Sequence, residues 1–551
     1  MTRNALRDVL IGAGIAVVAA AAAGPAFAQS TEIFCQPVEC GTFRALDEAH
    51  KSRLQDPFFR LVLATRPDAR KLADIEALIQ GSSGKRRLFV VHEEIQDPRR
   101  PTHRRAVVDF TGQNGGISLG PNVMLSFFFT DERVPEIPDL EVLAWDDVNG
   151  VYNYYKLDDQ RPAGATPPAA GDKVWKLAAT SRNADLLPPQ ARAGTCLGCH
   201  ASGVPVMKEL HLPWNNWHSS QSRVGYLVPA TPAANRWPVT DDPHFKDLDL
   251  AEPLEGAISN SIRAFNNRRF DELVARDASG RLAVADARRV LKPLFETTEV
   301  NFITARQRSN LHPLAPTPQT GPRQAIEIPA SFFVATDILA IVGIESDFET
   351  IPRIEPADYQ HLIESSGVRF EGANTNGPVR GDTHFAWFTP EQAFVATHWI
   401  ETLVQNKLLS AAFVAAAAGA DLENPIFSDA RAGLLKFIPE TFTVTPDEPH
   451  PDALTRAVIA RLDAAQPAAG SVEAEFLATL TAPDPVVAVR ARVAAYRERT
   501  ERRLASGDPA VRAAELKRLF DLLIARRRAV ADHPVFGRLR ESKALLPLPP
   551  Q

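Results

Sequence analysis

The sequence predicts an α+β fold in which a β-rich unit precedes a large, mainly α-helical region. Two observations lead to this prediction. Between about residues 86 and 180, short runs of β-branched and aromatic residues recur between prolines and glycines, which is typical of strands. From about residue 250 onward, apolar residues instead recur at intervals of three and four, which is the spacing of amphipathic helices.

The length of 551 residues exceeds the size of one ordinary hydrophobic core. We expect a leader over 1–28, a helical segment over 29–85, a β-rich unit over 86–220, a helical domain over 221–445 and an Arg-rich helical region over 446–551. The Arg-rich character of the last region suits either a solvated helix face or a patch for an acidic partner.

Composition and charge are those of an ordinary globular protein, with 45% apolar and 23% charged residues. The net charge of −6 gives no overall attraction to phosphate, so we expect no nucleic-acid partner. The sequence contains no Walker loop, dinucleotide-binding fingerprint or nucleophile elbow. Nothing in it therefore points to nucleotide-dependent or serine-hydrolase chemistry.

The first 28 residues have the pattern of a secretory signal peptide. Arg3 and Arg7 provide the positive start, residues 9–23 form an apolar run, and Ala26-Phe27-Ala28 is a small-residue cleavage site. We expect cleavage after Ala28, export to the periplasm and no membrane span once the leader is removed. The alternative, a retained membrane anchor, needs a longer apolar run.

The segment after the leader is expected to be helical over residues 43–80, because its apolar residues are spaced as in helices. It also contains Cys35 and Cys40, two of the four cysteines of the chain. In an oxidising compartment we expect these two to form a disulfide that closes a short loop. A second metal site is the alternative, and it lacks a nearby histidine.

The strands are expected in the following section, where the period changes. The predicted strands are residues 88–91, 106–110, 124–129, 141–145, 151–155 and 174–177. Two of these flank Asp146-Asp147-Val148-Asn149-Gly150, where Asn-Gly predicts a hairpin turn. The β-rich unit therefore ends next to the most informative motif of the chain.

That motif is Cys196-Leu197-Gly198-Cys199-His200, the Cys-x-x-Cys-His pattern of covalent haem attachment. Two cysteines three residues apart lie on one helical turn, from which both thiols can bond the vinyl groups of one porphyrin. The histidine that follows can then ligate the iron. The alternatives are a redox dithiol, which does not need the histidine, and a zinc half-site, which lacks a second ligand pair.

Beyond the motif the chain is expected to be mostly helical. Residues 257–265, 282–291 and 391–408 have helical spacing, and Pro-rich stretches at 313–318 and 446–451 suggest boundaries. This half of the chain resembles no family that we recognise.

The Cys-x-x-Cys-His segment resembles that of the c-type cytochromes, and the resemblance implies one covalently bound haem c. Mitochondrial-type carriers place a methionine ligand well downstream, but the chain has no methionine after Met207. Di-haem peroxidases need two motifs, and the four-helix cytochromes c′ lack strands before theirs. The order of a β-sheet followed by the motif is similar to cytochrome c′-beta proteins.

Two classes of function follow from this resemblance. The first is electron transfer by a periplasmic monohaem cytochrome, with a redox partner protein or a small-molecule oxidant. The second is a haem enzyme of the peroxidase or oxidase type, or a gas-binding protein, with an open distal face.

The ligand on the second face of the haem distinguishes these classes. We expect either a histidine, with His218 first, or an open site. Met207 is less favoured, because in a continuing helix it would lie about 10 Å further along the same side. The other candidates considered are Met124, His211, His384 and His398.

Overall fold

The structure is a computed structural model, and it describes residues 33–35, 44–91, 104–120, 122–130, 132–158, 173–193, 195–220, 238–309, 324–346, 348, 351–370, 378–383, 385–538 and 545–550. The expected leader, Cys40 and His384 lie outside the described residues, and with Cys40 the expected Cys35–Cys40 disulfide does too.

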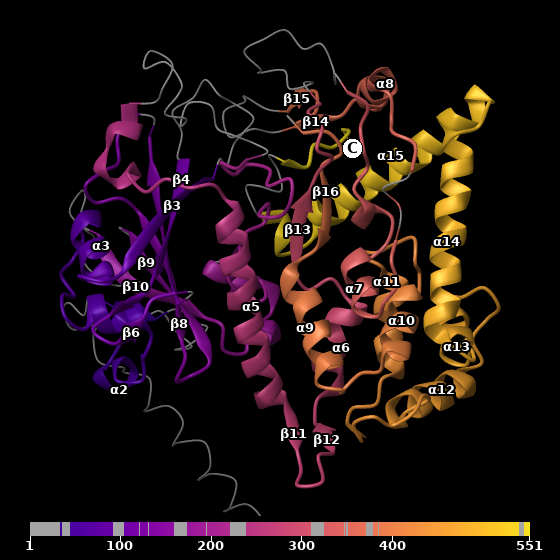
Figure 1. Ribbon diagram of the computed structural model, residues 1–551, viewed down its shortest axis with the longest axis horizontal. Coiled ribbons are helices and arrows are strands. Elements are labelled where there is room, and N and C mark those ends of the chain that lie inside the picture. The colour runs from indigo at the N-terminus through magenta and orange to yellow at the C-terminus, as the bar shows by residue number, and fades with distance from the viewer. Residues whose placement is uncertain are drawn as a thin grey trace, which may run out of the picture.

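The N-terminal half is built on an eight-stranded sheet with the order β2-β1-β10-β9-β8-β7-β4-β3 (Figure 1). Only the β1–β10 pair is parallel, and the other neighbours are antiparallel. The strands are β1 (Ile33–Cys35), β2 (Arg44–Ala45), β3 (Lys85–Val91), β4 (Arg104–Thr111), β7 (Val123–Phe129), β8 (Leu140–Asp146), β9 (Val151–Asp158) and β10 (Val174–Thr180). A separate small ladder joins β5 (Gln113–Asn114) and β6 (Ile117–Ser118).

The hairpin expected at Asn-Gly is the β8–β9 connection, in which Asp146 pairs with Val151. Gly150 adopts a φ of +66°, a conformation that glycine reaches without steric cost. The Asp146 carboxylate accepts a hydrogen bond of 2.9 Å from the Asn149 amide and so closes the turn. The prediction of this hairpin is confirmed.

Short helices cover one face of the sheet. They are α2 (Glu48–Lys51), a π-helical turn (Phe59–Leu63) and α3 (Leu72–Gln80). Phe58 packs between the rings of Tyr155 and Trp175 at centroid distances of 5.1 and 5.0 Å. The expectation of a helix over 43–80 is only partly right, because Pro57 and Pro67 interrupt the segment.

The opposite face of the sheet packs against α5 (Glu252–Leu273), which stands between the sheet and the helical region in Figure 1. The Tyr152 hydroxyl donates a hydrogen bond of 3.1 Å to the carbonyl of Ser261. Trp145 meets Phe265 edge-on at 6.4 Å. The core on this face is therefore shared between the β-rich unit and a helix that follows it.

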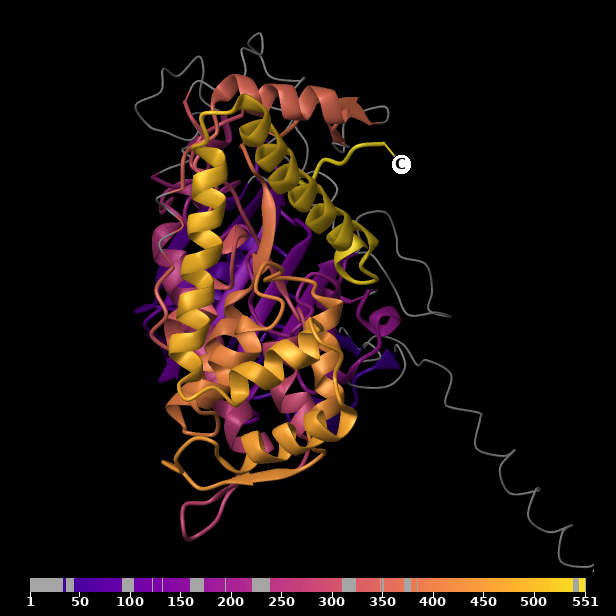
Figure 2. The same cartoon turned by 90° about the vertical axis from the view of Figure 1, so that its right-hand side faces the viewer.

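The rest of the chain forms a helical region with a few short strands. Its helices are α6 (Ala287–Phe295), α7 (Thr336–Ile341), α8 (Pro356–Ser366), α9 (Phe394–Gln405), α10 (Ala411–Gly419), α11 (Asp429–Ala432), α12 (Ala453–Ala465), α13 (Val472–Leu480), α14 (Pro485–Leu504) and α15 (Pro509–Asp532). Its strands are β11 (Val274–Arg276), β12 (Leu282–Val284), β13 (Val300–Ile303), β14 (Arg369–Phe370), β15 (Val379–Arg380), β16 (Thr389–Gln392) and β17 (Phe442–Val444). Figure 1 and Figure 2 show α14 as a long helix on the side away from the sheet, and α15 as a second long helix that runs from that side inward to β16.

One expected helix begins later than its spacing suggests. Residues 282–284 form β12, which pairs with β17, and α6 begins only at Ala287. Asp286 caps that helix by accepting a hydrogen bond of 3.1 Å from the Arg289 amide, which sets its start. The helix expected over 391–408 is present over a shorter range, as α9, because residues 391 and 392 belong to β16, which pairs with β13.

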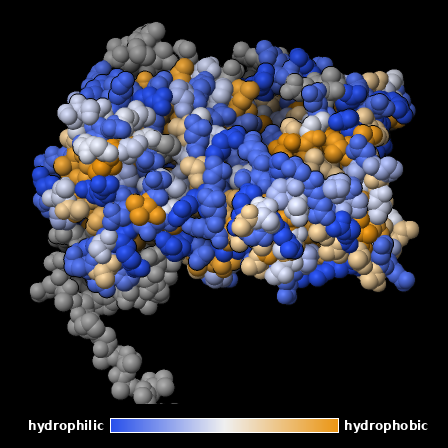
Figure 3. Space-filling view, turned by 60° about the horizontal axis from the view of Figure 1, so that its bottom comes forward, coloured by the Kyte–Doolittle hydropathy of each residue, from blue (hydrophilic) through white to orange (hydrophobic). Residues whose placement is uncertain are grey.

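The α+β prediction is confirmed, with the sheet in the N-terminal half and helices in the C-terminal half. In the described part of the chain, no helix has the length and the hydropathy needed to cross a membrane. The face in Figure 3 is mostly hydrophilic, with apolar residues in small separate patches.

Candidate haem site

The Cys-x-x-Cys-His motif lies in a loop that we call the haem loop, residues 195–208. Thr195 starts it by accepting a hydrogen bond of 3.1 Å from the Leu197 amide, which nucleates a 3₁₀ turn over Cys196–Gly198. Leu197 is fully buried and anchors this turn in the core. Cys199 is exposed and Cys196 is partly buried, so the two thiols are held at the edge of a cavity.

The haem loop reverses direction at Gly203, which has a φ of +79°. A Cβ at this position would lie 3.0 Å from the Cα of Ser181, so only glycine fits without displacement. The reversal brings Met207 and Lys208 back to the cavity wall. The expectation of a continuing helix that carries Met207 away from the motif is therefore wrong.

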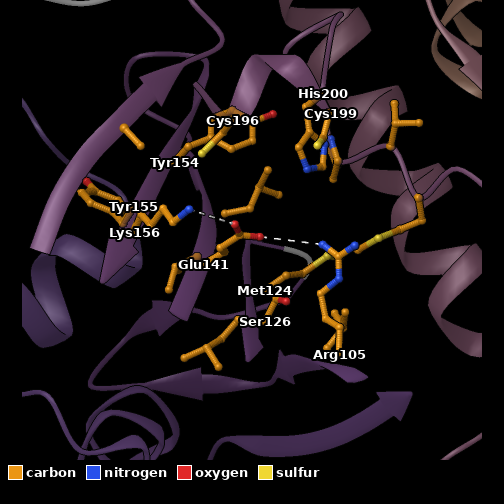
Figure 4. Close-up of a pocket in the computed structure, with 18 of the residues that line it drawn as sticks. Arg105, Met124, Ser126, Glu141, Tyr154, Tyr155, Lys156, Cys196, Cys199 and His200 are labelled. Carbon is orange, nitrogen blue, oxygen red and sulfur yellow. Dashed lines mark ion pairs between the residues drawn. The ribbon is translucent and has the colours of Figure 1, made fainter. Parts of the chain in front are cut away.

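The cavity has a volume of about 370 Å³ and lies between the haem loop and one face of the sheet (Figure 4). This is within the range of about 300–1,000 Å³ that is usual for cofactor and ligand sites. Adjacent strands place alternate residues on this face. The strand residues of the lining at these alternate positions are Val91, Arg105, Val107, Met124, Ser126, Glu141, Leu143, Tyr154, Lys156, Lys176 and Ala178, and Leu125, Val142 and Tyr155 line the cavity from intervening positions.

The imidazole of His200 is oriented by the haem loop itself. Its Nδ1 atom lies 2.8 Å from the carbonyl oxygen of Val204, so Nδ1 carries the proton and donates it. Burial lowers the pKa of His200, which favours the neutral ring. The lone pair of Nε2 is then left for a metal, the arrangement that metal-bound histidines usually show.

The surroundings of Cys196 do not favour the redox-dithiol alternative. Burial raises the pKa of the Cys196 thiol, which disfavours the thiolate that disulfide exchange requires. Among the residues that the structure describes, no group of three or more His, Cys, Asp or Glu side chains is placed to hold a metal ion.

Tyr154 lies beside His200, with a distance of 5.3 Å between the ring centroids. Its hydroxyl is buried and makes no hydrogen bond within the described residues, although the side chain lines the cavity. Burial raises its pKa, so the hydroxyl stays protonated. A buried donor without a partner is costly, and a polar atom of a molecule in the cavity would satisfy it.

A row of charged residues crosses the floor of the cavity. One carboxylate oxygen of Glu141 lies 3.7 Å from Nη1 of Arg105, and the other lies 3.7 Å from Nζ of Lys156 (Figure 4). The sheet register produces this row, because Glu141 pairs directly with Lys156 on the neighbouring strand. Sequence reasoning missed these residues, and their signal is charge at alternate positions of otherwise apolar strands.

The structure separates the candidate ligands for the second haem face. Met207 and Met124 line the cavity, whereas His218 does not. His218 instead continues a main-chain ladder, in which its amide bonds to Val90. His211 lies next to Glu255, and His398 bonds to Ser259 in the helical region. Of the described residues that line the cavity, His200 is the only histidine.

A buried carboxylate from the helical region holds the haem loop. Glu299 is fully buried and accepts hydrogen bonds from the Ser202 amide and hydroxyl at 3.0 and 3.1 Å. It also forms a close ion pair with the Lys208 ammonium group, which is itself buried. Sequence reasoning missed this contact, because Glu299 lies 97 residues from Ser202 and no local pattern marks it.

The residues present fit a covalently attached haem. Both thiols of the motif, the oriented histidine and a buried tyrosine hydroxyl without a partner line one cavity. No family model, curated protein or solved structure matches the chain. The interpretation of the site therefore depends on its motif and its geometry.

Proposed function

We propose that the protein is a periplasmic monohaem c-type cytochrome that transfers electrons. One haem c would be bound through Cys196 and Cys199, with His200 as an axial ligand of the iron. The observation that carries this proposal is that all three side chains line the same cavity, with Nε2 of His200 left unprotonated. Its partner would be a redox protein or a small-molecule oxidant.

When bound, haem c supplies an iron that gains and loses one electron. The chain's own residues hold the group and set its surroundings. Val204 fixes the His200 ring, and Glu299 fixes the backbone at Ser202. Cys199 is exposed, so the attached edge of the group would lie near the surface, where a partner can approach.

Covalent attachment is tested by expression in a host with c-haem maturation. Denatured protein should retain haem stain on a gel, and Cys196→Ala together with Cys199→Ala should abolish it. The matched control is Cys35→Ala with Cys40→Ala, which removes the other two cysteines and should leave the stain. Haem that leaves the denatured wild-type chain would overturn the proposal.

Export is tested separately, by the intact mass of protein from the periplasmic fraction. We expect a chain that begins at Gln29, since Ala26-Phe27-Ala28 precedes it. A periplasmic product that still contains residues 1–28 would contradict this cleavage site.

A second candidate function is supported by the charged floor of the cavity. In this alternative, a bound haem with an open second face would supply the chemistry for peroxide, oxygen or nitric oxide, and Arg105, Glu141 and Lys156 would provide charged groups in the same cavity. Ready binding of carbon monoxide to the reduced wild-type protein would favour it. A weak far-red band that disappears in Met207→Leu or Met124→Leu would instead show methionine ligation, against our expectation.

A further inference from the structure

A second cavity, of about 340 Å³, lies where the β-rich unit, α5, α6 and the C-terminal end of α15 meet. We call it the junction cavity. Four cationic side chains line it, one from the short helix α4 (Pro189–Ala193), one from α5 and two from α6, together with two carboxylates and one histidine. These residues are Arg192, Arg269, Arg289, Lys292, Asp185, Glu296 and His533.

The two carboxylates are already engaged. The Asp185 carboxylate accepts hydrogen bonds from the Arg289 guanidinium at both of its oxygens, at 2.7 and 2.8 Å. It accepts a further hydrogen bond of 2.9 Å from the Arg269 guanidinium. Glu296 lies 3.4 Å from Lys292 in a half-exposed pair. The formal charges around the cavity therefore leave an excess of two positive charges.

Arg192 contributes much of this excess. Its guanidinium donates to the carbonyls of Leu187, Ala201 and Asp185 at 2.9, 3.1 and 3.3 Å, and it forms no ion pair within the described residues. Burial lowers the pKa of Arg192 and of Arg269, the cost of placing their charges away from water. An anion in the cavity would offset that cost.

His533 adds a neutral donor to the same wall. Its Nδ1 accepts hydrogen bonds of 3.2 Å from the amides of Val535 and Phe536, so the proton of the neutral ring is on Nε2. Guanidinium, ammonium and imidazole N–H groups are the donors that recognise oxyanions.

We propose that the junction cavity binds a small dianion that carries oxyanion groups. A volume of about 340 Å³ admits inorganic phosphate or a short dicarboxylate, and an excess of two positive charges matches either one. The site is separate from the cavity lined by Cys196, Cys199 and His200, although Ala201 and Ser202 of the haem loop form part of its wall.

The test is isothermal titration of the full-length protein with inorganic phosphate and with succinate, against sodium chloride at matched ionic strength. We expect saturable binding of one equivalent of at least one dianion and none of chloride. The stronger of the two identifies the ligand class as phosphate or dicarboxylate. Absence of saturable binding by both dianions at millimolar concentration would overturn the proposal.

Variants with opposite charge changes sharpen this test. Lys292→Gln should weaken binding at least tenfold, and Glu296→Gln should strengthen it several-fold, because both side chains are half-exposed and their removal spares the fold. The matched control is Lys407→Gln, whose ammonium pairs with Asp447 on an exposed surface. Equal affinity in all three variants would overturn the proposal.

Discussion

The buried pair of Glu299 and Lys208 gives the sharpest test of how the helical region supports the haem loop. Glu299→Gln would remove the negative charge and leave the Lys208 ammonium buried without its partner. Removing one member of a buried ion pair costs about 3–5 kcal/mol of the free energy of unfolding. The upper part of this range applies, because Glu299 is 0% and Lys208 8% exposed, and the same carboxylate also holds Ser202.

The assay is urea denaturation followed by tryptophan fluorescence, applied to Glu299→Gln, Lys208→Met and the double variant. We expect each single variant to lose several kcal/mol and the double variant to lose about 2 kcal/mol less than their sum. The matched control is Asp447→Asn, which breaks an exposed pair with Lys407 and should cost less than about 1 kcal/mol. Losses that add within about 0.5 kcal/mol would refute the reasoning.

Three further predictions concern local features. Burial raises the pKa of Asp56 from 3.8 to about 6. Between these pH values the folded protein binds the extra proton, so its stability falls as pH rises. Asp56→Asn should flatten this slope of stability against pH, as measured by urea titrations. Gly203→Ala should destabilise the protein more than Gly116→Ala, which has a similar positive φ but open space around it, and equal urea midpoints would contradict the steric argument. Burial lowers the pKa of His211, but the carboxylate of Glu391 and other nearby acidic groups raise it to about 9. The stability gained from its charge is present below about pH 6.5 and lost towards pH 9. If His211→Gln kept the wild-type slope of stability against pH, this reasoning would be contradicted.

The sequence predicted those parts of the fold that local chemistry determines. The β8–β9 hairpin follows from the Asn149-Gly150 turn, and α9 follows from its helical spacing. The expected helix over 43–80 failed where prolines interrupt it. The helix expected over 282–291 failed only at its start, because residues 282–284 form β12, which pairs with β17, about 160 residues away in the chain.

The candidate site was predictable only in part, for the same reason. Cys196, Cys199 and His200 lie close together in sequence, so the Cys-x-x-Cys-His motif that they form can be recognised without a structure. The cavity floor and the Glu299 contact depend on strand register and long-range packing, which no local pattern records. The expected position of Met207 was wrong because the chain reverses direction at Gly203. The sequence allows this reversal but does not require it.

The placement of α5 has a consequence for how the molecule unfolds. Its one side packs on the sheet through Tyr152 and Phe265, and its other side meets α9, where Asn266 donates a hydrogen bond of 3.1 Å to the Val395 carbonyl. A helix shared by two cores makes their stabilities interdependent, so neither half can open without uncovering apolar surface of the other. A fragment that stops at residue 220 would lose this helix and expose Trp145 and Tyr152, which pack against it. Shortened versions of the chain should therefore keep residues through at least Leu273.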